Sequence, residues 1–249
     1  MLNTSTSREE MGSQTDISER MAETDALAHL YRFVARVLEE EADDTLLDLI
    51  RGELRGPLEA LGLHFDEEFH NTPLEALRET LAEEYTCLFV APGCISPYAS
   101  VFETGCMFKE PADRAIEAYR AAGWDYHRRM SGEFPDHIGT MLGFCGLLAE
   151  AEADALAITE LERSDELRDR RERFLLDQLG SWGPGWCQRA AEAAMHPFYK
   201  TVLSLTESLL WSELSQFVDR RRLRDLAELN RREPKRLDYD ADFRKASGL

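Results

Sequence analysis

An aspartate and a histidine stand side by side at positions 136 and 137, after Phe134 and Pro135 and directly before an apolar stretch. Polar side chains at such a junction cost folding free energy unless they are hydrogen-bonded or serve in function. Asp136 could cap the following helix, because Asp is a favoured N-cap residue, or its carboxylate could meet a cation of a partner. His137 would then lie near the positive end of the helix dipole, which disfavours protonation. A neutral imidazole can both donate and accept a hydrogen bond, which suits recognition of a peptide backbone.

Cysteine chemistry is the alternative use of this pair. A thiol hydrolase would combine Cys87 or Cys145 with the Asp-His pair, but adjacent Asp and His side chains do not readily form the base and its orienting group. A metal site could combine Cys87, Cys94 and Cys106 with a histidine, yet the gaps match no zinc pattern. We therefore predict no catalytic residue, no metal ligand and no cofactor, and a thiol-dependent or metal-dependent enzyme stays the weakest alternative.

The composition indicates a globular protein with an acidic surface. The chain has 249 residues, 43% of them apolar, and a formal net charge of −19. Such a charge argues against nucleic acid as a partner and favours a cationic one. There is no apolar run of the roughly 18 to 20 residues that a membrane span needs and no apolar signal core at the N-terminus. With five cysteines at irregular spacings, these features predict a cytoplasmic protein, monomeric or homodimeric, without stable membrane insertion.

Apolar residues recur every three to four positions along most of the chain, and no strand alternation is found, so the fold class expected is all-α. The most apolar helix is expected from Asp136 onward, at the centre of the fold. A long loop is expected after Pro92-Gly93, a helix capped by Ser164, and a turn at 182–186. Residues 1–22 are polar and aperiodic, which predicts a disordered acidic tail. The sequence therefore predicts a tail at residues 1–22, an N-terminal helical subdomain at 23–134, a C-terminal helical subdomain at 135–218 and a basic C-terminal extension at 219–249.

Arginines crowd that extension, from Arg220 to Arg236. They can form a solvated helix face or a docking surface for an acidic partner, and both readings stay open.

Three segments carry a resemblance to a known family: EYTCLFVAPG at 84–93, SPYASVF at 96–102 and FPDHI at 134–138. In this order within an all-helical chain, and with AYRAAG at 118–123, they resemble the TorD/DmsD/NarJ family of redox-enzyme maturation chaperones. Family members often have Glu close to the Pro-Asp-His element, whereas here Glu133 is followed by Phe134. The family also gives no role to the polar tail or to the basic extension.

The resemblance implies a TorD-like helical bundle, with its two subdomains joined at a Pro-Asp-His hinge, that acts as a chaperone and not as an enzyme. It implies binding of the twin-arginine leader and apo-form of a molybdopterin oxidoreductase, held for cofactor insertion before export. Carried over by position, the leader-binding residues would be Tyr85, Leu88, Phe89, Pro97, Tyr98, Pro135, Asp136 and His137. An acidic surface beside an apolar groove agrees with that ligand. The alternative within the same fold is a permanent small assembly subunit of a respiratory redox complex.

Overall fold

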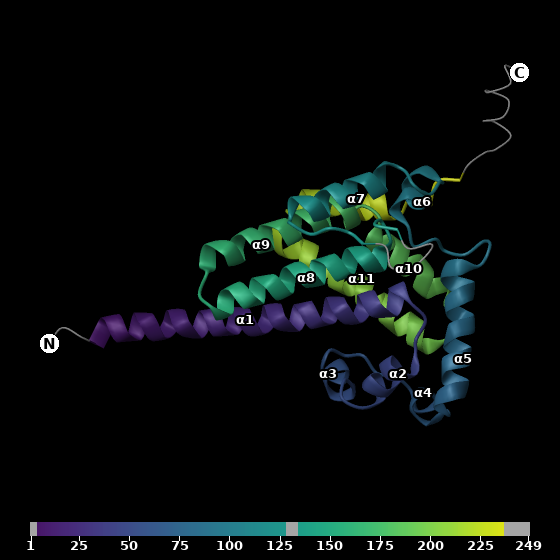
Figure 1. Cartoon of the computed structure of the whole chain (residues 1–249), viewed down its shortest axis with the longest axis horizontal. Coiled ribbons are helices and arrows are strands. Elements are labelled where there is room, and N and C mark those ends of the chain that lie inside the picture. Colours follow the sequence, from purple (N-terminus) through teal and green to yellow (C-terminus); the bar gives the residue numbers. More distant parts are fainter. Residues whose placement is uncertain (1–3, 128–133, 237–249) are drawn as a thin grey trace, which may run out of the picture.

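The computed structural model describes residues 4–127 and 134–236, and this part of the chain is helical, with no strand beyond one isolated β-bridge (Figure 1). The predicted all-α class is therefore confirmed. Two single turns of π-helix, η1 and η2, extend α5 and α9. The elements are α1 (Thr4–Glu39), α2 (Asp44–Arg51), α3 (Arg55–Ala60), α4 (Glu67–Asn71), α5 (Leu74–Tyr85), η1 (Thr86–Val90), α6 (Ala99–Thr104), α7 (Glu110–Ala121), α8 (Ile138–Ala157), α9 (Leu161–Phe174), η2 (Leu175–Leu179), α10 (Gly183–Ala193), α11 (Pro197–Phe217) and α12 (Arg220–Asn230).

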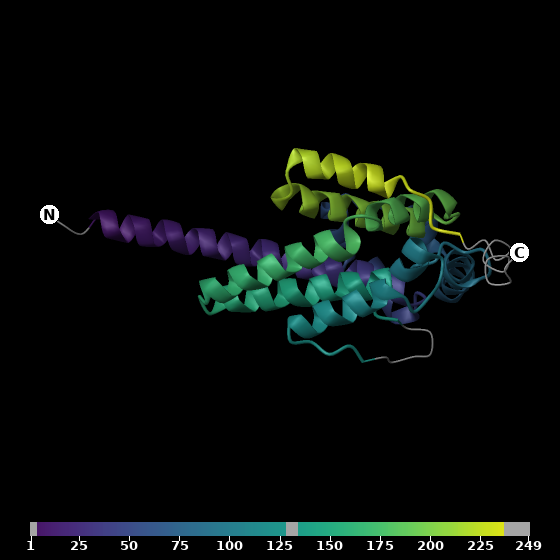
Figure 2. The same ribbon diagram turned by 90° about the horizontal axis from the view of Figure 1, so that it is seen from above.

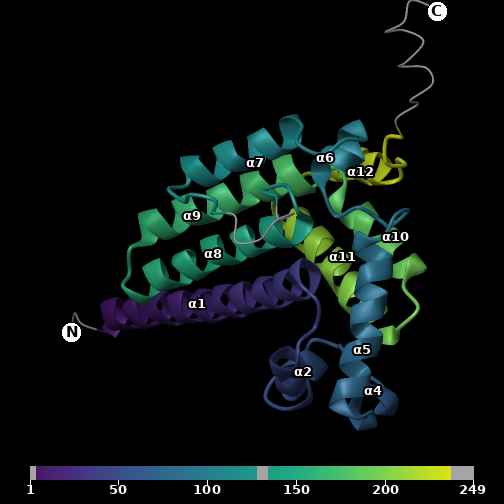
Figure 3. The same cartoon turned by 45° about the vertical axis from the view of Figure 1, so that its right-hand side comes forward.

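The centre of the fold is the pair formed by α1 and α8, which lie side by side (Figures 1 and 3). Glycines of α8 bring the two backbones together. A Cβ at Gly139 would stand 3.2 Å from the carbonyl oxygen of Ala35, and one at Gly146 would stand 3.1 Å from the Cβ of Tyr31. Small residues at one face of a helix permit this close approach. Most residues of α8 are buried, so the prediction of a central, largely enclosed helix is confirmed.

The remaining helices cover this pair. α9 packs beside α8, and α10 packs against α11 (Figure 2). α5 runs crosswise to α1 near the end of the bundle (Figures 1 and 3). Trp182 and Trp186, expected to flank a turn, are fully buried, because α10 begins at Gly183 and places both rings in the core. None of the described helices is both long and apolar enough to cross a membrane.

The N-terminal segment differs from the disordered tail predicted for residues 1–22, of which residues 1–3 lie outside the described part. α1 begins at Thr4 and its first half extends beyond the body of the molecule (Figures 1 and 2). Extending an existing helix adds one hydrogen bond for each residue ordered, so a polar sequence can continue a helix that is packed elsewhere. Arg20 of this segment forms an ion pair with Asp165 of α9 at 3.0 Å.

Two local predictions also need correction. The stretch expected as a long loop contains α6, and Ser164, expected as an N-cap, lies buried inside α9. The expected basic extension begins with α12, which packs on α10 and α11. Asn230 holds α12 in place, because its side chain accepts a hydrogen bond from the N–H of Gly185 at 2.7 Å and donates one to the carbonyl of Gly180 at 2.8 Å. Residues 237–249 of that extension lie outside the described residues.

Candidate peptide-binding site

Two of the segments singled out in the sequence lie side by side. The N–H of Ile138 donates to the carbonyl of Pro97 at 2.8 Å, and the N–H of Ala99 donates to the carbonyl of Asp136 at 3.0 Å. An antiparallel β-bridge joins Tyr98 and His137. The structure therefore brings the Pro97-Tyr98 and Pro135-Asp136-His137 segments together into one junction at the start of α8.

Asp136 is a structural residue of this junction. Its side chain is 1% exposed, and one carboxylate oxygen accepts hydrogen bonds from the backbone N–H of Ser100 at 2.7 Å and from the Ser100 hydroxyl. Ser100 lies in the first turn of α6, so Asp136 caps α6 across the junction rather than its own helix. The expectation that Asp136 is the N-cap of the central helix is wrong, since the N-cap is His137.

His137 is buried and neutral. Burial lowers the pKa of its imidazole to about 4. Its Nδ1 accepts a hydrogen bond from the N–H of Gly139 at 3.1 Å, which leaves the proton of the neutral ring on Nε2. Desolvation thus favours the neutral imidazole that the sequence predicted.

Tyr85, Leu88 and Phe89 lie beneath the junction. All three are buried, and the Phe89 ring stacks on Trp186 at 5.6 Å. The Tyr85 hydroxyl donates to the carbonyl of Leu38 at 3.1 Å, and burial raises the pKa of this hydroxyl. The backbone of the same segment holds the stretch at 94–98, because the N–H of Ile95 donates to the carbonyl of Leu88 at 2.8 Å.

Aromatic rings continue from the junction to the surface. Tyr98 is half-buried, with its ring centre 5.5 Å from that of Phe134, and Phe134 stands 4.2 Å from Phe108. Phe108 is 67% exposed and adopts a φ of 58°, which is uncommon for a residue other than glycine. A strained residue that exposes a large apolar ring indicates a surface for contact with a partner.

A groove lies next to the junction, between α1, α8 and the segment after α7. Its volume is about 450 Å³. Tyr119 connects the two features, since its ring lines the groove while its hydroxyl donates to the carbonyl of Pro135 at 2.6 Å. The residues that line the groove are Arg32, Ala35, Arg36, Glu39, Glu40, Tyr119, Trp124, Asp125, Tyr126, Thr140, Gly143, Phe144 and Leu147.

The groove combines apolar walls with carboxylates. Leu147 is 40% exposed, and the Trp124 ring stands edge-on to Phe144 at 6.1 Å. The cations at the rim are already paired, because Arg36 contacts Asp43 at 2.9 Å and Arg32 contacts Glu150. The groove thus offers apolar surface together with negative charge, a combination that suits an apolar segment bearing cations.

None of the predicted leader-binding residues lines this groove. Pro135 is connected to it only through Tyr119, whose hydroxyl donates to the Pro135 carbonyl. The sequence prediction did not identify Trp124, Asp125 or Leu147. The sequence held one signal for the first two: they follow Gly123, in a segment where no helical pattern accounts for a tryptophan.

Burial disfavours the reactive thiolate form at Cys94, Cys145 and Cys187. Cys145 and Cys187 are buried, and burial raises the pKa of the Cys145 thiol to about 12 and raises that of Cys187 as well. Burial also raises the pKa of the Cys94 thiol. No group of three or more metal-binding side chains occurs among the residues that the structure describes.

The chain matches a known protein family and is similar to known chaperones. The family model described as "Nitrate reductase delta subunit" matches residues 48–188, which is more than half of the chain. The chain is 30% identical over 132 residues to the chaperone protein TorD of Vibrio vulnificus (strain YJ016) and 29% identical to that of strain CMCP6. Each match covers 50% of this chain and 58% of the relative, so the chain spans less than two thirds of the length of these proteins.

Among solved structures, a candidate redox enzyme maturation protein from Archaeoglobus fulgidus is similar, with 24% identity and a TM-score of 0.45. The similarity covers 74% of this chain and 93% of that one. The resemblance expected from the three sequence segments is confirmed by the family match. The chain belongs to the nitrate reductase delta subunit family, the family of the TorD and NarJ proteins.

Proposed function

We propose that this chain is a maturation chaperone, and not an enzyme, that binds the twin-arginine leader of a molybdopterin oxidoreductase in its apo-form and holds it in the cytoplasm until the cofactor is inserted. The family match and the likeness to TorD chaperones support the general role. The observation that carries the finer proposal is the groove beside the Pro-Asp-His junction, with apolar walls and carboxylates at its rim.

The chemistry of the ligand fits this groove. A twin-arginine leader presents two guanidinium groups followed by a moderately apolar helix. Trp124, Phe144 and Leu147 offer apolar surface to such a helix, while Asp125 supplies negative charge at its edge. An amphipathic helix in a hydrophobic groove is a recurrent mode of peptide recognition.

A fluorescence anisotropy titration with a labelled peptide tests the proposal, the peptide carrying two adjacent arginines and an apolar helical segment. Leu147→Ala removes buried apolar surface from the complex and is expected to weaken binding about tenfold, or about 1.4 kcal/mol. Leu161→Ala is the matched control, because Leu161 is 39% exposed, lies on α9 and does not line the groove. Equal affinities for the parent and both variants would remove the groove from the proposal.

The rival role is a permanent subunit of a redox complex, and the name of the family, a delta subunit, favours it. Copurification separates the two roles. A chaperone is recovered with the apo-oxidoreductase and is absent from the enzyme once its cofactor is inserted, whereas a subunit stays with the mature enzyme at constant stoichiometry.

A further inference from the structure

The segment that follows α12 crosses to α6. Residues 231–236 leave the end of α12 and run to α6 (Figure 3), where the N–H of Lys235 donates to the carbonyl of Phe102 at 2.9 Å. The Phe102 carbonyl is one of the last four of α6, which have no partner within the helix. The C-terminal segment therefore caps a helix that is remote from it in sequence.

α6 depends on such caps because it is short. It has six residues, and a helix of this length is not stable alone, since its few hydrogen bonds do not offset the cost of ordering its first turn. Asp136 caps the first turn through the N–H of Ser100, and Lys235 caps the last turn. Both ends of α6 are thus held by segments that are distant in sequence.

Two arginines contact the side chain of the capped residue. Phe102 is buried, and the guanidinium groups of Arg189 and Arg232 stand 5.3 Å and 5.9 Å from the centre of its ring. An arginine over the face of an aromatic ring at about this distance is attracted to it. Arg232 also donates from Nε to the carbonyl of Leu229 at 2.9 Å and from Nη2 to the carbonyl of Ser181 at 3.3 Å. These contacts join the end of α12 to α6 and to the turn before α10.

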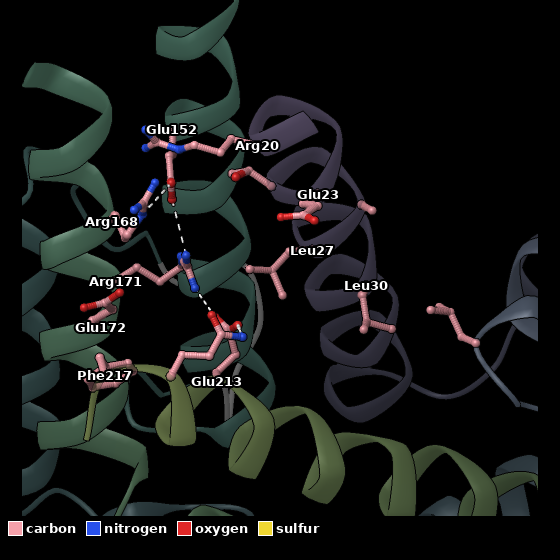
Figure 4. A pocket seen from close by; sticks show the side chains of 14 residues that line it. Arg20, Glu23, Leu27, Leu30, Glu152, Arg168, Arg171, Glu172, Glu213 and Phe217 are labelled. Carbon is pink, nitrogen blue, oxygen red and sulfur yellow. Dashed lines mark hydrogen bonds and ion pairs between the residues drawn. The ribbon is translucent and has the colours of Figure 1, made fainter. Parts of the chain in front are cut away.

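The partners of Arg232 differ from those of the arginines in the core. Arg171 lies between the carboxylates of Glu152 and Glu213 in a buried ionic cluster (Figure 4). No carboxylate pairs with Arg232 among residues 4–127 and 134–236, although the chain has 48 acidic residues. Arg232 therefore serves to join three parts of the fold and not to neutralise a charge.

The position of α6 determines where Tyr98 lies. α6 begins directly after Tyr98, whose carbonyl accepts a hydrogen bond from the N–H of Phe102 at 3.1 Å, and the Tyr98 ring stands 5.5 Å from that of Phe134. We propose that residues 231–235 form a strap that holds α6 and with it Tyr98, and that Arg232 is the positioning residue of this strap. The strap needs no ligand, whereas its effect on leader binding rests on the proposed function.

Hydrogen exchange of the full chain, followed by mass spectrometry, tests the strap without a ligand. The peptide that spans residues 96–106 reports the opening of α6. Lys235→Pro removes the N–H that caps Phe102, and Lys235→Ala is the matched control, because it removes the same charge from the same exposed position and keeps the N–H. Exchange at 96–106 should become about three- to tenfold faster for Lys235→Pro and stay unchanged for Lys235→Ala. Equal exchange rates for Lys235→Pro and the parent overturn the proposal.

Arg232→Met and Arg231→Met form a second matched pair. Both remove one positive charge from adjacent exposed positions, but Arg231 pairs with Glu228 on α12 and only Arg232 contacts Phe102. Exchange at 96–106 should become about threefold faster for Arg232→Met, less so for Arg232→Lys, which keeps a cation near the ring, and stay unchanged for Arg231→Met. Equal effects of Arg231→Met and Arg232→Met would show that the lost charge and not the contact is responsible, which overturns the role of Arg232. Thermal melts check that each variant folds.

An anisotropy titration with the peptide that carries two adjacent arginines and an apolar helical segment measures the effect on binding. Arg232→Met should bind it about threefold more weakly than Arg231→Met, although the loss of a positive charge by itself favours a cationic ligand. Faster exchange at 96–106 with equal affinities for both variants overturns the link between the strap and recognition. If the parent does not bind the peptide, the proposed function fails, and the exchange rates alone decide on the strap.

Discussion

Replacing Asp136 distinguishes a structural carboxylate from one that meets a ligand. In the structure one oxygen of Asp136 accepts two hydrogen bonds from Ser100 in a fully enclosed site. Asp136→Asn keeps an acceptor oxygen but removes the charge. Hydrogen bonds to a charged group contribute about 1.5 to 3 kcal/mol each and neutral ones about 0.5 to 1.5. Since a neutral amide is also cheaper to bury, the net loss of unfolding free energy is expected to be about 1 kcal/mol.

Asp136→Ala removes the acceptor altogether. The N–H of Ser100 then lies buried without a partner, and α6 loses the cap of its first turn. The expected cost is about 2 to 4 kcal/mol. Urea denaturation of the parent, both Asp136 variants and Ser100→Ala measures these values, and Asp136→Ala with Ser100→Ala forms a double-mutant cycle. Because Ser100→Ala keeps the backbone N–H, the cycle measures the bond to the Ser100 hydroxyl alone. An Asp136→Ala variant as stable as the parent would refute the role of this carboxylate as a cap of α6.

Leader binding by the same variants separates the two roles. If Asp136 acts by holding the segment at Pro97 and Tyr98, Ser100→Ala should weaken leader binding in the same direction as Asp136→Asn, because both loosen one contact. If the carboxylate turns outward to meet an arginine of the leader, only Asp136→Asn should lose affinity, about tenfold. The burial of Asp136 favours the first outcome.

Four other substitutions have expected outcomes that follow from the structure. His137→Gln should make the free energy of unfolding less dependent on pH below pH 7. The imidazole has a pKa of about 4 in the folded chain and about 6.5 in the unfolded chain, so protonation favours unfolding. The parent should therefore lose about 2 kcal/mol between pH 7 and pH 5, as measured by urea denaturation at each pH. Phe89→Ala should cost about 3 to 5 kcal/mol of stability, because this ring is 5% exposed and stacked in the core. Chemical denaturation measures this cost, and a variant as stable as the parent would show that Phe89 is not a core residue. Gly143→Ala should raise stability by about 0.5 to 1 kcal/mol, since the new Cβ would meet only an ordinary contact at 3.6 Å. Gly139→Ala should instead cost about 1 to 3 kcal/mol, because its Cβ would stand too close to the backbone of α1. Shifts of the melting temperature in opposite directions check this contrast.

Local patterns in the sequence predicted the helices well. The apolar period of α11 and the nearly uniform apolar character of α8 are properties of short windows, and the structure confirms both elements. Failures occurred where an interaction from elsewhere in the fold decides the conformation. The stretch containing α6 has too few apolar periods to be recognised as a helix, and its N-terminus is capped by Asp136, which is remote in sequence.

The candidate site was harder to predict for a related reason. Apolar residues at helical spacing look the same whether they line a groove or fill a core, so Leu88 and Phe89 could be assigned to either. Their burial follows from the position of α10, whose Trp186 covers Phe89, and no pattern near residue 89 carries that information. Leu147 shows the opposite case, because it sits in an apolar run yet faces the groove.

The junction at Pro-Asp-His uses its polar groups inside the fold. Asp136 is engaged by Ser100, and His137 is held neutral by burial and bonded to Gly139. Groups satisfied in this way fix the geometry around them, because moving either segment would break buried hydrogen bonds. What the junction fixes is the placement of surfaces that can meet a ligand, namely the aromatic rings from Tyr98 to Phe108 and, through the Tyr119 hydroxyl, the wall of the groove. We therefore propose that the polar residues that first draw attention in the sequence position a recognition surface, and that the apolar and acidic side chains beside them are the ones to meet a ligand.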